Sequence, residues 1–132
     1  MKPKKVIRIE YPTTGRGLFT GDIDGKTPSV YNFAPEISDR HRSFPNMIND
    51  FIELFIVEGN LSEYFCAYLS IDQLQEWVTP DELRVVIKEG FVILLLEVTH
   101  YHESKYQVIY TKESITQTMD ITSLFIKQLD EK

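Results

Sequence analysis

The alternation of apolar and polar positions is clearest between residues 64 and 110, where it predicts a strand, two helices and two strands in turn. Residues 64–69 are apolar and partly aromatic, and so short a run favours a buried strand. Ser70 then predicts the N-cap of a helix, because Gln73 follows three positions on, as in a capping box. Trp77 could stack on a ligand, but packing against the sheet is the simpler interpretation.

A second capping box starts the next helix. Thr79 fits the N-cap, Pro80 fits the first helical position, where no N–H is needed, and Glu82 fits the third. Gly90 suits the left-handed position that follows a helix, so we expect the helix to end just before it. Residues 91–98 are almost wholly apolar, which is typical of a strand buried on both faces.

Two more segments have the period of a strand. Residues 6–11 alternate between charged and apolar side chains, which places Arg8 and Glu10 on one face. Residues 106–110 also alternate, and we expect them to pair antiparallel with residues 91–98 across the polar hairpin loop between them.

Helical spacing recurs outside this region. Residues 45–57 carry a broad apolar face, which predicts a core helix ended by Gly59, with an aromatic-rich loop as the alternative. A last helix is predicted to open at residues 119–120, because apolar residues then recur at helical intervals. Residues 22–43 are polar and interrupted by glycine and proline, so we expect a long irregular loop there, with a short turn near residues 30–33.

Length and pattern together predict one α+β domain over residues 1–132. A mostly antiparallel sheet combines the strands near Val6, Tyr64, Phe91 and Tyr106, and three or four helices pack on it. A chain of this length buries enough surface to fold without disulfides.

The charge of the chain limits its partners. The net charge is −6 and the isoelectric point is near 5.0, so nucleic-acid phosphates would repel the protein, whereas a basic protein surface would attract it. The single cysteine, Cys66, has apolar neighbours and is predicted to be a core residue. No signal peptide follows the basic start, and no apolar run is long enough for a bilayer, so we expect a cytoplasmic protein with no membrane partner.

Few residues suggest a metal or catalysis. His100 and His102 could ligate a metal together with Glu103 or His41, but two solvated loop histidines are the plainer interpretation, and we expect no metal. Ser70 is not surrounded by a nucleophile-elbow motif, and helix capping already explains it.

Carboxylates are prominent in and beside the two central helices. Spaced carboxylates on a rigid face can copy the charge pattern of a phosphate backbone and occupy a nucleic-acid groove on another protein. An ordinary solvated helix face is the alternative. The residues predicted to contact a partner are Asp72, Glu76, Asp81 and Glu82.

The order of several segments resembles that of small proteins encoded by bacteriophages. The resemblance rests on residues 6–19, 65–78, 90–92 and 107–110. These pieces are structural rather than catalytic, so the resemblance implies a phage protein that acts in the host cell without implying an activity.

The same order is distantly similar to the core of ADP-ribosyltransferases. That resemblance implies that Arg8 touches the phosphates of NAD and that Ser70 or Tyr68 lines the nicotinamide pocket. It places Gln107 where the family has its catalytic acid. Because Gln107 is uncharged, it cannot stabilise a developing oxocarbenium ion, and the resemblance then implies a binding surface without catalysis.

Two hypotheses of function follow. The first is a non-enzymatic phage-type protein without a cofactor, which binds and inhibits a host or defence protein through its acidic surface. A CRISPR effector nuclease, with its basic nucleic-acid channels, is the partner class best matched by charge. The alternative is an ADP-ribosyltransferase-like enzyme or a binder of NAD-derived nucleotides, in which Arg8, Ser70 and Gln107 would share a cleft.

Overall fold

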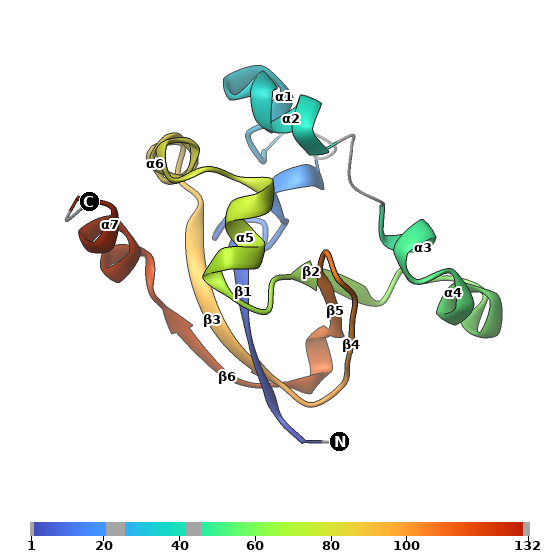
Figure 1. Ribbon diagram of the computed structural model, residues 1–132. Coiled ribbons are helices and arrows are strands. Elements are labelled where there is room, and N and C mark those ends of the chain that lie inside the picture. Colours follow the sequence, from blue (N-terminus) through green and yellow to red (C-terminus); the bar gives the residue numbers. More distant parts are fainter. Residues whose placement is uncertain (1, 21–25, 42–45, 131–132) are drawn as a thin grey trace.

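Two three-stranded antiparallel sheets, surrounded by short helices, form the fold (Figure 1). In the first sheet, β3 (Val92–Val98) lies between β1 (Lys4–Glu10) and β6 (Ile115–Asp120). The α+β class predicted from the sequence is therefore confirmed. The computed structural model describes residues 2–20, 26–41 and 46–130.

In the second sheet, β5 (Val108–Thr111) lies between β2 (Tyr64–Ala67) and β4 (Tyr101–Glu103). The two sheets meet where Ile7 of β1 and Tyr68, just after β2, exchange backbone hydrogen bonds with N···O distances of 2.7 and 2.8 Å. This junction fixes the end of β2 against the middle of β1.

The helices are short and lie around the sheets. Figure 1 shows α3 and α4 standing apart from the others at one end of the molecule. Among the described residues there are more helices than the three or four expected: α1 (Val30–Phe33), α2 (Pro35–His41), α3 (Met47–Asp50), α4 (Ile52–Glu58), α5 (Ile71–Trp77), α6 (Pro80–Lys88) and α7 (Thr122–Asp130), with 3-10 turns at Leu18–Thr20 and Lys112–Ser114.

The predicted helix caps are present. The Ser70 hydroxyl accepts a hydrogen bond from the Gln73 N–H at 3.2 Å, which starts α5. Thr79 and Glu82 form a reciprocal capping box at the start of α6. Gly90 follows α6 with φ of 106°, the left-handed conformation that glycine adopts without a Cβ clash.

Apolar side chains gather in three cores. The largest packs α5 and α6 against β1 and β3, the second lies between the sheets, and the third lies under α3 and α4. Representative members are Leu74, Trp77, Leu83 and Phe91 in the first core, Val6, Leu96 and Tyr110 in the second, and Phe51, Leu61 and Ile109 in the third.

The predicted pairing of residues 106–110 with residues 91–98 is wrong. β5 pairs with β2 and β4, whereas β3 pairs with β1 and β6. Part of the expected hairpin loop is strand β4. The last helix starts at Thr122, after β6, which the pattern did not predict because this edge strand is exposed along almost its whole length.

Two predictions for the first half also need correction. The loop expected over 22–43 is largely helical where it is described. Val30 on α1 and Ile37 on α2 are fully buried, and this burial stabilises the two helices. Residues 22–25, 42 and 43 lie outside the described part. The single helix expected over 45–57 is divided into α3 and α4 at Phe51, whose φ of −121° and ψ of 44° are not helical. Pro45 lies outside the described residues.

Candidate functional site

Three of the four carboxylates predicted to contact a partner lie free on the surface. Asp72 and Glu76 are exposed on α5, and Asp81 is exposed in the first turn of α6. None of the three forms an ion pair with another described residue. Their negative charge is therefore available to a partner.

Glu82 is engaged within the protein. Its carboxylate accepts hydrogen bonds from both terminal nitrogens of Arg40, at 2.6 and 3.1 Å, and from the Thr79 N–H at 2.8 Å. Although burial raises the pKa of Glu82, these hydrogen bonds outweigh it and hold the pKa below its ordinary value. Glu82 thus fixes α2 to the start of α6.

The surrounding sequence is more acidic than the four residues indicate. Residues 46–83 contain eight carboxylates and no lysine, arginine or histidine, so their charge is −8 while the whole chain carries −6. The rest of the chain is therefore +2. Among the described residues, Arg40 is the one cation that forms an ion pair with this stretch. We call residues 46–83 the acidic stretch; it includes α3, α4, β2, α5 and the start of α6.

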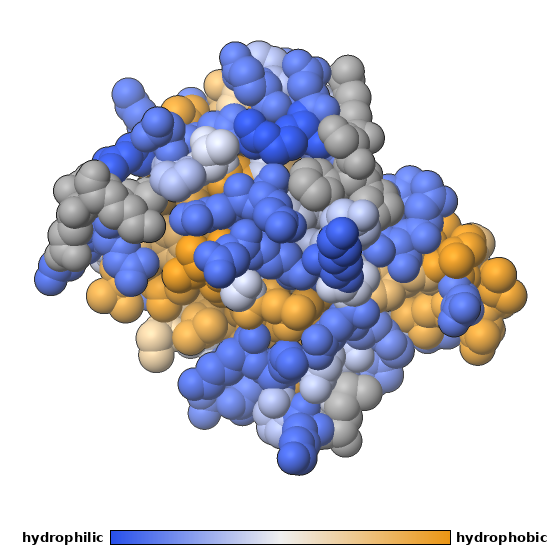
Figure 2. Space-filling model, viewed as in Figure 1, coloured by the Kyte–Doolittle hydropathy of each residue, from blue (hydrophilic) through white to orange (hydrophobic). Residues whose placement is uncertain are grey.

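An exposed apolar surface lies within the acidic stretch. Ile48, Ile52 and Ile56, at intervals of four residues, are 43%, 45% and 73% exposed, and Val57 is 82% exposed. We call these four residues the α4 ridge. Figure 2 shows apolar side chains covering the projecting end of the molecule that α4 forms. The apolar stripe of this segment, which we expected to be core, is thus divided between the third core and solvent.

The ridge is bordered by acidic side chains. Glu53 and Glu58 are exposed on the same helix, and Glu63 is exposed in the turn before β2. Contiguous apolar surface with a polar rim is typical of protein interaction sites. The regular interval of isoleucines and the run without basic residues are visible in the sequence, so both signals were present before the fold was known.

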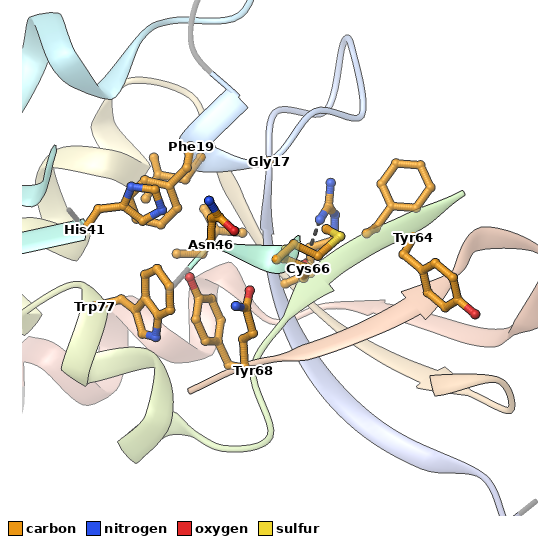
Figure 3. A pocket seen from close by; sticks show the side chains of 14 residues that line it. Gly17, Phe19, His41, Asn46, Tyr64, Cys66, Tyr68 and Trp77 are labelled. Atoms are coloured by element: carbon orange, nitrogen blue, oxygen red, sulfur yellow. Dashed lines mark hydrogen bonds between the residues drawn. The ribbon is translucent and has the colours of Figure 1, made fainter. Parts of the chain in front are cut away.

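A pocket of about 290 Å³ lies where β1, β2, α2, α3 and α5 converge. We call it the inner pocket (Figure 3). Its lining is mostly aromatic and apolar, with a few polar groups. The lining side chains used below are Arg8, Phe19, His41, Asn46, Cys66, Tyr68, Trp77 and Gln107.

Arg8 is buried and committed to structural contacts. Its exposed fraction is 4%. The guanidinium donates hydrogen bonds to the Cys66 carbonyl at 2.8 Å, the Gly15 carbonyl at 3.1 Å and the Glu10 carboxylate at 2.9 Å. Because Glu10 balances its charge, Arg8 does not make the inner pocket strongly positive.

Aromatic rings form one wall of the inner pocket. The Phe19 and His41 rings are stacked, with centroids 4.0 Å apart and planes within 8°. Trp77 lies 5.3 Å from His41 and 5.8 Å from Tyr68 between ring centroids. Burial lowers the pKa of His41, which favours a neutral imidazole at neutral pH.

Polar groups complete the lining of the inner pocket. The Gln107 amide donates to the Asp50 carboxylate at 3.0 Å, and the Ser104 hydroxyl donates to the same oxygen. Burial raises the pKa of the Cys66 thiol to about 11, so the thiol is protonated at neutral pH. A protonated thiol is a poor nucleophile, so the surroundings of Cys66 do not activate it for covalent chemistry.

The structure brings together part of the predicted nucleotide-binding set. Arg8 and Gln107 both line the inner pocket, as does Tyr68, whereas Ser70 lies outside its lining and caps α5. His100 lies near Tyr64, with its Nε2 3.1 Å from the Tyr64 hydroxyl. No group of three potential metal ligands occurs among the residues that the structure describes.

The chain thus forms a small α+β protein with an acidic stretch, residues 46–83, that carries an exposed apolar ridge. Comparison with known families matches residues 1–123 to the family described as Bacteriophage T4 Y00F protein, and the chain belongs to this family. No curated protein and no solved structure matches. The phage resemblance is therefore supported, and no similarity to ADP-ribosyltransferases is found. Within the described residues, every helix is too short or too polar to span a membrane.

Proposed function

We propose that this phage protein is a non-enzymatic binding protein, which attaches to a basic protein in the host cytoplasm and inhibits it. The observation that carries the proposal is the α4 ridge, an exposed apolar surface within a stretch of eight carboxylates and no basic residue. A nucleic-acid-binding defence protein, such as a CRISPR effector nuclease, has the complementary charge.

The ridge supplies the apolar centre of the contact. Burying a whole isoleucine side chain stabilises a complex by roughly 1.5–3 kcal/mol. Ile56 and Val57 are 73% and 82% exposed in the free protein, so most of this gain is still available on binding. Apolar anchors of this kind commonly dominate the binding energy of protein interfaces.

The carboxylates orient the partner and accelerate its association. Glu53 and Glu58 are exposed beside the ridge residues on α4, and Asp72, Glu76 and Asp81 add exposed negative charge on α5 and α6. Charges at the rim accelerate association with an oppositely charged partner and reject like-charged proteins. Association should therefore weaken as salt is raised.

The test starts with affinity capture from the phage's host, followed by measurements on the purified partner. Ile56→Ser should weaken binding by about tenfold or more, since even the lower end of that range, about 1.5 kcal/mol, corresponds to a tenfold change in affinity. Leu124→Ser is the matched control, because Leu124 is 61% exposed on α7, outside the acidic stretch. The partner's own activity, assayed with the same variants, should recover in step with the loss of binding.

A second pair of variants tests the charge. Glu53→Lys with Glu76→Lys should weaken binding and flatten its salt dependence, whereas Glu89→Lys with Glu113→Lys, exposed sites outside the acidic stretch, should change little. A captured protein whose affinity responds neither to Ile56→Ser nor to the first charge pair would overturn the proposal.

A further inference from the structure

The hydroxyl of Tyr68 has no hydrogen-bond partner among the residues that the structure describes. Tyr68 is 7% exposed, and its backbone is held by the junction with Ile7, yet its side-chain oxygen bonds no other residue within 2–20, 26–41 and 46–130. Figure 3 shows its ring pointing into the inner pocket, between Trp77 and Asn46. A buried hydroxyl without a partner costs free energy, so its presence here calls for a ligand or water in the pocket.

The walls of the inner pocket select the shape of a ligand. The rings of Phe19, His41, Trp77 and Tyr68 present flat apolar surfaces, and flat aromatic ligands stack on such surfaces. A volume of about 290 Å³ lies just below the usual range for ligand pockets, which begins at roughly 300 Å³. A single or fused ring fits this size better than a whole dinucleotide does.

The charges of the inner pocket select against an anion. Glu10 neutralises Arg8, and two carbonyls take up further N–H groups of its guanidinium. Asp50 lies behind Gln107 and adds negative charge. A phosphate would meet no free cation among the described lining residues. A neutral ring would lose little hydration free energy on entering the pocket.

We propose that the inner pocket binds a neutral, planar nitrogen heteroaromatic ring of nucleobase size, with the Tyr68 hydroxyl donating a hydrogen bond to a ring nitrogen or carbonyl. The site is distinct from the acidic stretch's outer surface, and the proposal does not depend on the partner-binding function. It differs from the nucleotide alternative above, because the ring is recognised and the phosphates are not.

Ligand binding can be measured directly by the fluorescence of Trp77, since this residue is the sole tryptophan of the chain and forms part of the pocket wall. Its emission is titrated with adenine, cytosine and uracil to millimolar concentration, and with adenosine, AMP and inorganic phosphate for comparison. We expect a saturable change with at least one base, a similar affinity for adenosine and AMP, and no change with phosphate. No response to any base, or a response to phosphate alone, would overturn the proposal.

Tyr68→Phe separates binding from packing, because it removes only the hydroxyl oxygen. The Tyr68→Phe variant should bind the responsive base about fivefold more weakly, because one hydrogen bond is worth about that much. Its melting temperature without ligand should stay the same or rise, because no hydrogen bond to a described residue is lost. Tyr31→Phe, at an exposed position on α1, is the control and should change neither. Unaltered base affinity in Tyr68→Phe would refute the role of the hydroxyl, and with it the proposed site.

Discussion

Arg8→Met should destabilise the protein more than any exposed substitution on the same strand. The Arg8 guanidinium connects β1 to the Cys66 carbonyl of β2 and to the Gly15 carbonyl of the following loop, and it pairs with Glu10. Methionine matches the length and apolar character of the arginine stem but donates none of these hydrogen bonds. The variant thus tests whether Arg8 is structural or is free to bind a ligand.

The expected decrease in the free energy of unfolding follows from these contacts. Removing one partner of a buried ion pair typically costs about 3–5 kcal/mol, because the remaining charge is left without compensation. Glu10 is 25% exposed, so water recovers part of that cost, but the two carbonyls each lose a charged donor. We therefore expect a loss of about 3 kcal/mol, which is a large part of the stability of a domain this size.

Urea unfolding followed by Trp77 emission measures the loss, with Lys5→Met as the control. Lys5 is an exposed neighbour on β1, so its substitution should change the free energy of unfolding by less than about 0.5 kcal/mol. A loss below about 1 kcal/mol for Arg8→Met would refute the structural reasoning. Arg8 would then regain the phosphate-binding role that the nucleotide alternative assigns to it.

Three further predictions concern single features. Burial raises the pKa of Glu82, but hydrogen bonds, chiefly from Arg40, outweigh this effect and hold the pKa below its ordinary value. The wild type should therefore be more stable than Glu82→Gln at neutral pH. Urea unfolding across pH should show that this difference is lost as the pH falls through the lowered pKa of the folded state. Gly90→Ala should lower the melting temperature more than Gly59→Ala, because both have positive φ but only at Gly90 would the new Cβ lie 3.2 Å from Tyr11. Light scattering should show that self-association through the α4 ridge increases with salt.

Local signals in the sequence were sufficient for the helix ends but not for the sheets. Thr79 and Glu82 satisfy each other's backbone N–H groups within four residues, so their arrangement depends on nothing distant. Strand pairing depends on which edges meet in three dimensions. The short separation of residues 91–98 and 106–110 in the sequence predicts a hairpin. However, β5 pairs with β2, because Tyr64 of β2 and Ile109 of β5 pack in the same core.

The candidate sites were predictable to different degrees. The exposure of Asp72, Glu76 and Asp81 could be predicted from the sequence, because charge on the outer side of a capped helix needs no tertiary information. The pairing of Glu82 with Arg40 could not, because it is a contact between distant helices. The inner pocket was not, since its aromatic wall joins Phe19, His41 and Trp77 from three elements far apart in the chain. A hydroxyl without a partner, as in Tyr68, becomes visible only when every neighbour has been placed.

The acidic rim determines which contacts the α4 ridge favours. If two copies met ridge to ridge, Glu53 and Glu58 of each copy would approach the same carboxylates of the other. Each pair of like charges at about 4 Å costs about 1 kcal/mol in water and more where water is excluded. A basic partner converts every such repulsion into an attraction while burying the same apolar surface. Under the proposed function, the carboxylates would therefore act against self-association and in favour of a basic partner, so that one arrangement of charge would serve the specificity of binding.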